Sequence, residues 1–297
     1  MEFRAIYNPG LPVRLRAAGL DVAAFAVSGF ASYVLVPGVD LCFDLGHCGV
    51  EAAGLRNVFL SHVHQDHAGG VARHVSLRRM FGGARSKIVC PAESADALAA
   101  FLRAADALEE KCAEADPAEM IRGVLPGDTV ALGRRYTVTA FDVAHRIASR
   151  GYTLVEHRRR LKPAYRELPG EALAEARARG EDLYDVHSVN ILTYVGDSTL
   201  ATLEARPEIF ESEAVFVEAT HLPPTEKAAS ARWGHTHWDD LIAWLEAHLD
   251  TMACQQIIVK HFSMKYRPHD LREVHRKLPP RLRGRVTMLM HGVAEET

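Results

Sequence analysis

Four potential metal ligands follow one another closely after a short apolar segment. The string Ser-His-Val-His-Gln-Asp-His occupies residues 61–67, and the apolar run before it predicts a buried strand that ends there. On an extended backbone His62 and His64 point to the same side. Asp66 and His67, in the turn that opens the next helix, approach from another direction. Such nitrogen and oxygen ligands suit two adjacent divalent ions, typically zinc. The competing interpretation is a set of unrelated surface histidines.

A centre with two ions needs more ligands, and three residues at the ends of later predicted strands fit. The candidates are His145, Asp197 and His261, which follow the predicted strands at residues 136–143, 189–195 and 256–260. Each alone could be an ordinary turn or core residue. Together they complete the coordination. We assign His62, His64 and His145 to one ion, Asp66, His67 and His261 to the other, and Asp197 as the bridge beside a water or hydroxide.

Composition predicts a soluble globular protein. The chain has 297 residues, of which 48% are hydrophobic and 25% charged, enough to bury a large core. No apolar run approaches the roughly 20 residues that cross a bilayer, and the N-terminal residues do not resemble a secretory signal. The five cysteines are scattered without a C-x-x-C pair, which argues against a disulfide framework. We therefore expect a cytoplasmic protein with reduced thiols and no membrane contact.

Strands dominate both halves of the chain, with helices between them, which predicts two packed sheets with helices outside. A charged, helix-prone stretch at residues 158–180 interrupts this pattern, so we expect one domain over residues 1–297 with a basic insertion at about 146–188. Strands are predicted at residues 22–30, 32–36, 40–45, 57–61, 88–90, 129–132, 136–143, 152–156, 189–195, 214–218, 256–260 and 285–290, and helices after Gly70 and at 92–114, 239–249 and 269–278.

Positive charge is concentrated in two windows. Residues 146–180 hold nine Lys and Arg against four Asp and Glu, and residues 260–285 hold nine against two, although the whole chain has a net charge of -3. Two basic segments on an acidic body could attract a phosphate backbone. The alternative is a pair of solvated helix faces.

The histidine string resembles that of the metallo-β-lactamase superfamily, and three further strings resemble those of its ribonuclease Z (tRNase Z) family. These are Glu218-Ala219-Thr220, residues 234–237 (Gly-His-Thr-His) and residues 261–266 (His-Phe-Ser-Met-Lys-Tyr). The likeness is to the short, plant-type form and extends over nearly the whole chain. It includes residues 43–46, 161–165, 168–170 and 278–280.

The resemblance implies an α/β fold, the four-layer αβ/βα sandwich, with a site for two zinc ions, or manganese, at one edge between the sheets. It implies a homodimeric endonuclease that removes the 3′ trailer of precursor tRNA by metal-activated hydroxide. Asp66 would hold that hydroxide, while His235 protonates the leaving oxygen and Glu218 orients His235. The substrate phosphates would meet Ser263, Lys265, Arg158, Arg159, Arg160 and Lys162.

Two features differ from the family pattern. Lys265 stands where many members have Arg, which keeps the charge but loses the bidentate geometry for phosphate. Longer forms carry a Gly/Pro-rich arm that grips tRNA at the place where this chain has its basic insertion. That insertion either grips RNA in the arm's place or forms a lid over a smaller substrate.

Other functions remain open at this point. The same centre would suit a hydrolase of small phosphodiesters such as cyclic nucleotides, or of lactones or thioesters, because a fold and its metals do not fix the substrate. A non-catalytic RNA-binding protein is the other alternative, but it would be expected to have lost ligands. Trp233 and Trp238 flank His235 and could stack on bases, although packing in the core or in a dimer is favoured.

Overall fold

Two β-sheets packed face to face form the centre of the molecule. The computed structural model describes residues 8–109 and 116–291. Within them the first sheet has the order β1-β2-β3-β4-β5-β6-β7, with β14 also paired to β2, and the second has the order β15-β13-β12-β11-β10-β9-β8. The strands of the first sheet are β1 (Val13–Ala17), β2 (Leu20–Ser28), β3 (Ala31–Val36), β4 (Leu41–Phe43), β5 (Asn57–Phe59), β6 (Lys87–Pro91), β7 (Ile121–Val124) and β14 (Phe262–Ser263). Those of the second are β8 (Thr129–Leu132), β9 (Tyr136–Asp142), β10 (Arg150–Leu161), β11 (Tyr184–Tyr194), β12 (Ala214–Glu218), β13 (Gln256–Lys260) and β15 (Val286–Met288).

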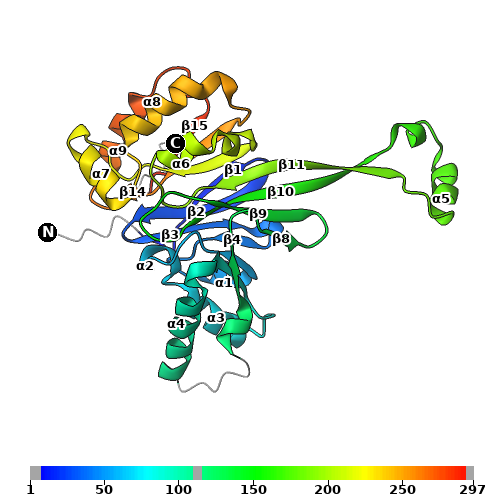
Figure 1. The fold of residues 1–297 in the computed structure, drawn as a ribbon, viewed down its shortest axis with the longest axis horizontal. Coiled ribbons are helices and arrows are strands. Elements are labelled where there is room, and N and C mark those ends of the chain that lie inside the picture. Colours follow the sequence, from blue (N-terminus) through cyan, green and yellow to red (C-terminus); the bar gives the residue numbers. More distant parts are fainter. Residues whose placement is uncertain (1–7, 110–115, 292–297) are drawn as a thin grey trace.

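Helices cover the outer face of each sheet, which gives the four-layer αβ/βα sandwich (Figure 1). One group packs on the first sheet and contains α1 (Val50–Gly54), α3 (Val71–Met80) and α4 (Ala95–Leu108). The other group packs on the second sheet and contains α6 (Ala201–Ala205), α8 (Trp238–His248) and α9 (Pro268–Arg276). The remaining α-helices are α2 (Gln65–Ala68), α5 (Gly170–Ala178) and α7 (Lys227–Trp233). The fold class predicted from the resemblance is confirmed.

Strand β2 shows why the sequence folds into layers. Its residues Val22, Ala24 and Ala26 face the core between the sheets. Alternate residues, such as Phe25, face the helices on the other side. Because both faces of the strand are covered, nearly every position is apolar and the strand reads as a continuous apolar run. The inter-sheet core therefore forms without alternation of polar and apolar residues.

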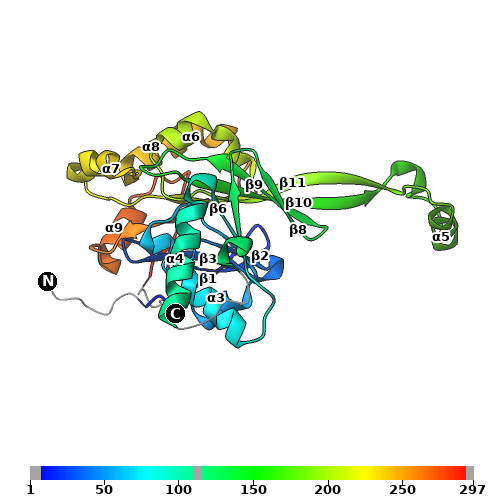
Figure 2. The same ribbon diagram turned by 60° about the horizontal axis from the view of Figure 1, so that its bottom comes forward.

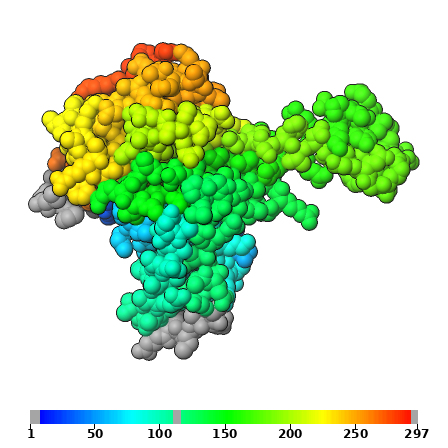
Figure 3. Space-filling model, viewed as in Figure 1, coloured from blue at the N-terminus to red at the C-terminus, as the bar shows by residue number. Residues whose placement is uncertain are grey.

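The outer parts of β10 and β11, with α5 between them, form an arm that projects from the body of the molecule (Figures 1 and 3). Strands β10 and β11 pair antiparallel as far as Leu161 and Tyr184, and α5 lies at the tip of the hairpin (Figure 2). The sequence predicted a helix-prone stretch at 158–180 and strands only at 152–156 and 189–195. The strands are much longer than predicted because the arm carries charged side chains on exposed backbone ladders, which apolar periodicity does not detect.

Most other predicted strands are present with shifted ends, whereas β1, β7 and the two-residue β14 were not predicted. The helix predicted at 92–114 ends at Leu108, and its last residues lie outside the described part of the chain. Cys42, Cys48, Cys90 and Cys254 are buried free thiols, while Cys112 lies outside the described residues.

The described residues contain no helix that is both long enough and apolar enough to span a bilayer.

Candidate metal centre

Seven side chains predicted as ligands meet at one edge of the sandwich, where strands of both sheets end. His62 and His64 follow β5, and Asp66 and His67 lie in α2. Three more come from the second sheet. His145, Asp197 and His261 follow β9, β11 and β13, respectively. The carboxyl ends of parallel strands lie at one edge of a sheet, so distant parts of the sequence converge there.

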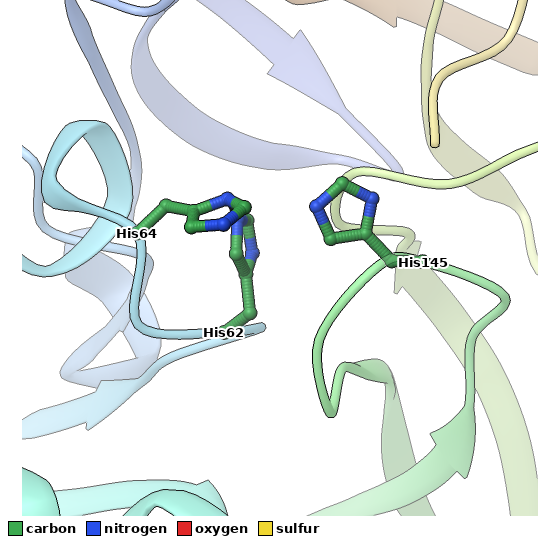
Figure 4. Close-up of side chains that lie close together, drawn as sticks. All are labelled: His62, His64 and His145. Carbon is green, nitrogen blue, oxygen red and sulfur yellow. The ribbon is translucent and has the colours of Figure 1, made fainter. Parts of the chain in front are cut away.

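The first group of potential ligands consists of His62, His64 and His145, with one nitrogen of each within 4.8 Å of the others. Figure 4 shows the rings of His62 and His64 on one loop facing that of His145 on the opposite loop. The Nε2 atom of His145 is buried and has no hydrogen-bond partner. A buried, unpaired nitrogen is costly, and coordination of a cation would satisfy it.

The second group consists of Asp66, His67, Asp197 and His261, again within 4.8 Å of one another. Oδ2 of Asp197 lies 3.2 Å from Nε2 of His67 and 3.3 Å from Nε2 of His261. The same oxygen is 3.8 Å from Nε2 of His62 in the first group. Its partner Oδ1 is buried without a hydrogen bond. Asp197 thus lies between the two groups, as a bridging ligand would.

The imidazoles are held through the nitrogens that face away from these groups. Nδ1 of His62 bonds to the Ser61 hydroxyl (3.0 Å), and Nδ1 of His145 bonds to the Gly234 carbonyl (2.8 Å). Nδ1 of His261 bonds to the Thr220 hydroxyl at 3.0 Å. Metal-ligating histidines almost always use the second ring nitrogen in this way, which fixes the ring orientation. The residues present therefore fit a divalent metal.

Asp44 supports this arrangement and was not among the predicted site residues. It is fully buried after β4, and its carboxylate accepts hydrogen bonds from Nδ1 of His67 (2.7 Å) and from the hydroxyl of Tyr194 (2.6 Å). The backbone N–H and hydroxyl of Ser61 also donate to it. Through these contacts it holds both His67 and the residue that positions His62. The only signal in the sequence was an acidic residue at the end of an apolar strand, within the Phe-Asp-Leu-Gly string.

His261 occupies a turn where the chain passes from one sheet to the other. Its backbone is left-handed, with φ 68°, a conformation that is uncommon for residues other than glycine. Strand β13 before it belongs to the second sheet, and β14 after it pairs with β2 of the first. The strained turn places the imidazole between the sheets, consistent with the tendency of backbone strain to cluster at functional sites.

Glu218 and His235 form a hydrogen-bonded pair beside the second group. Nδ1 of His235 donates to Oε1 of Glu218 at 2.9 Å, and this leaves Nε2 of the ring available. Glu218 is buried and is fixed by the backbone N–H of Ser198 and by the N–H and hydroxyl of Thr220. The pair was predicted from the family resemblance alone. A histidine oriented by a buried carboxylate can transfer a proton at a defined atom.

Burial and neighbouring charges shift the pKa values of the histidines in the site in opposite directions. Burial lowers the pKa of His62 and His145, which favours the neutral form that binds metals. Burial also lowers the pKa of His67, but the charges of Asp197 and Asp44 outweigh it and raise the pKa well above its ordinary value. Because a metal ligand must be a neutral imidazole, we expect metal affinity to fall in acid.

The side chains predicted to meet substrate phosphates lie in two places. Ser263 and Lys265 follow β13 near the centre, and Nζ of Lys265 is 2.6 Å from a carboxylate oxygen of Glu226. The others are on the arm, which extends from the end of the molecule opposite to α2, α7 and β14 (Figures 1 and 2). The arm therefore does not cover the centre as a lid.

Most of the arm's predicted cations already contact other side chains. Arg158 pairs with Glu156 and Glu213. Lys162 pairs with Asp182 at 3.0 Å. The guanidinium of Arg159 lies 4.4 Å from the ring centroid of Tyr184, and Arg160 is exposed.

The two tryptophans that flank His235 differ. Trp238, the first residue of α8, is buried in the core, as favoured from the sequence. Trp233 is not a core residue, because 47% of it is exposed. The difference arises because Trp238 begins a helix that packs on the second sheet, whereas Trp233 ends the short helix α7 at the surface.

Comparisons with known proteins agree with this geometry. The plant protein tRNase Z TRZ1 of Arabidopsis thaliana is 25% identical over 284 residues, which cover 94% of this chain and 98% of that protein. The crystal structure of human tRNase Z, short form, has a similar fold, with a TM-score of 0.53 at 16% identity over 95% of this chain and 96% of that one. Zn(2+)-bound PqqB from Methylobacterium extorquens is also similar, with a TM-score of 0.55 at 13% identity over 88% and 86% of the two chains. The model of the beta-lactamase superfamily domain matches residues 46–261, which include all seven candidate ligands, and the chain therefore belongs to the β-lactamase superfamily.

Proposed function

We propose that this chain, a metal-dependent hydrolase similar to ribonuclease Z, is a phosphodiesterase that removes the 3′ trailer from precursor tRNA. The observation that carries the proposal is the Glu218–His235 pair beside the two ligand groups, since a reaction with a poor leaving group needs a positioned proton donor. The similarity to plant and human tRNase Z over nearly the whole chain supports the choice of substrate.

The residues divide the reaction between them. The seven ligands would hold two zinc or manganese ions, which supply an activated water and charge stabilisation when bound. Asp66 would accept the proton of the attacking water, whose oxygen forms a bond to phosphorus in line with the leaving 3′ oxygen. His235 would give its proton to that oxygen as the phosphorus–oxygen bond breaks. The products are a 3′-hydroxyl on the tRNA and a 5′-phosphate on the trailer.

The arm and the cations near the centre would bind the RNA at separate places. An RNA backbone is a long polyanion, and each phosphate contact adds affinity that falls with salt. Arg160 on the arm, with Arg158, Arg159 and Lys162, would contact phosphates remote from the cleavage point, whereas Ser263 and Lys265 would contact phosphates near it.

We further propose a cytoplasmic homodimer, in which two arms and two centres are presented together.

The test is incubation of the purified protein, with Zn²⁺ or Mn²⁺, with a 3′-extended precursor tRNA and with bis(p-nitrophenyl) phosphate in parallel. We expect RNA cleavage directly after the discriminator nucleotide, and chelation should abolish it. Turnover of the small ester with intact RNA would overturn the proposed substrate while retaining the hydrolase.

Turnover of the small ester without RNA cleavage would point to the second candidate function, a hydrolase of small phosphodiesters. One observation favours it: the predicted phosphate-binding cations Arg158, Lys162 and Lys265 are already ion-paired with carboxylates. A small ester would need none of them.

A further inference from the structure

Trp233 is exposed at the surface between two arginines. Its ring centroid lies 4.9 Å from the guanidinium carbon of Arg146 and 5.4 Å from that of Arg232. The other two tryptophans, Trp238 and Trp244, are only 5% and 9% exposed, against 47% for Trp233. The core therefore does not account for Trp233, and its large apolar face meets solvent and cations.

This cluster adjoins the candidate metal centre. Arg146 follows His145 in the chain, and Trp233 precedes Gly234, whose carbonyl accepts the hydrogen bond from His145. The two backbone segments touch. A Cβ atom added at Gly234 would lie 3.0 Å from both the Cγ of Arg146 and the Nδ1 of His145, and the residue has a left-handed φ of 77°. Glycine thus brings the tryptophan and Arg146 to the side of the centre that carries His145 and His235.

The two arginines, which were not among the predicted phosphate-binding residues, also differ from most of the cations that were. In the described part of the chain, neither Arg146 nor Arg232 makes an ion pair, and both are exposed. Lys265, Arg158 and Lys162 are each neutralised by a carboxylate. An unneutralised guanidinium is free to bind a phosphate in bidentate geometry. Arg146 and Arg232 therefore offer positive charge that is available to a polyanion beside the centre.

We propose that Trp233 stacks on a nucleobase of the RNA next to the scissile phosphate, while Arg146 and Arg232 bind the flanking backbone. Aromatic stacking with nearby arginines is the usual way in which proteins hold single-stranded nucleic acid. The inference rests on the proposed function, because it names how that site recognises RNA. A dimer contact at this surface is disfavoured, since an interface would desolvate two guanidinium groups without a carboxylate from this patch to pair them.

The experiment measures binding independently of cleavage. Binding is measured by the anisotropy of a fluorescently labelled, short single-stranded oligonucleotide that carries 2′-O-methyl groups and resists cleavage, and the tryptophan emission of the wild-type protein is recorded in the same titration. A second titration uses an abasic oligomer of the same length and charge. We expect the base-containing oligomer to quench fluorescence and to bind more tightly than the abasic one.

Substitutions locate the effect. We expect Trp233→Ala to weaken binding of the base-containing oligomer by roughly 5- to 150-fold, the range for loss of one stacked base, and Trp233→Phe to restore part of it. Phe81→Ala removes another exposed aromatic, at the end of α3, and should leave binding unchanged. Sedimentation and metal content of each variant serve as controls for assembly and folding.

Two results would overturn the inference: equal binding of both oligomers by the wild type, or conversion of a dimer to monomers in Trp233→Ala, which would make the patch an interface between copies. These results are separate from failure of the proposed function, which is the absence of RNA cleavage. Base-dependent binding without cleavage would support the stacking site and reject the nuclease.

Discussion

Asp44 accepts hydrogen bonds from three side chains around the candidate centre, those of Ser61, His67 and Tyr194. We expect Asp44→Asn to weaken metal affinity by about 10- to 100-fold, because partners behind metal ligands have effects of that size. An amide keeps the shape of the carboxylate but loses its charge and part of its accepting capacity. Competition with a chromogenic chelator measures the affinity directly.

Tyr194→Phe is the matched control, because it removes only one of the donors to Asp44. It should reduce metal affinity less than Asp44→Asn. If the two variants lost affinity equally, the contact between Asp44 and His67 would not be what matters.

The Glu218–His235 pair makes a prediction about pH. Burial lowers the pKa of His235, but the charge and hydrogen bond of Glu218 outweigh it and raise the pKa to about 9. The proton needed for a general acid is therefore present at neutral pH and is lost as the pH rises through that value. In Glu218→Gln the charge is gone while burial remains, so we expect the alkaline limb of the kcat/KM profile to move to lower pH.

His235→Ala tests the same role in another way. It should leave metal content near that of the wild type and lower the rate by about a hundredfold or more, the scale of a lost general acid. A parallel loss of bound metal would instead identify His235 as a ligand.

At the scale of single residues, sequence reasoning identified side chains that follow predicted strands, because those strands are apolar and their ends are sharp. His145 and Asp197 were found in this way. Asp44 was not singled out, since its importance lies in contacts with Tyr194 and His67, far away in the sequence. Glu218 and His235 needed the family resemblance.

The arm is the element whose role is tested most cleanly. Arg158 lies directly opposite His187 in the antiparallel β10–β11 pair. Residues 159–186 can therefore be replaced by Asn-Gly, the preferred two-residue hairpin turn. We expect the shortened protein to fold, to bind metal and to turn over bis(p-nitrophenyl) phosphate as before. Cleavage of precursor tRNA should fall by roughly tenfold or more and depend less on salt, as phosphate contacts are lost.

Undiminished RNA cleavage by the shortened protein would show that the arm does not bind substrate. Loss of small-ester turnover would show instead that the deletion damages the body.

The arm also shows why element prediction from one sequence is uneven. Strand β2 has two buried faces and is recognised by its apolar residues. The outer part of β10 has no buried face, and its Arg158, Arg159 and Arg160 suit a helix as well as a strand. This segment forms a strand and not a helix because it pairs with β11, and such pairing cannot be recognised from the local sequence.

At the scale of the whole molecule, the candidate ligands connect the two sheets. His62, His64, Asp66 and His67 come from the first sheet, and the other three from the second. An ion that binds only the folded state adds about 2.7 kcal/mol when its free concentration is 100 times Kd. We therefore expect chelation by EDTA to lower Tm by about 4 °C for each ion removed, and added zinc to restore it, as measured by differential scanning calorimetry. An unchanged Tm after verified metal removal would contradict a structural role for the ions.

The hairpin at the arm has one more consequence. Each of its strands is held in the sheet by a second neighbour, β10 by β9 and β11 by β12, while exposed tips are preferred sites of proteolysis. A single cut near α5 would leave two fragments joined along the β10–β11 ladder, one carrying His62 to His145 and the other Asp197 to His261. Neither fragment alone would hold a complete set of ligands. Hydrolytic activity should therefore return only when the two separately produced fragments are mixed and reassemble.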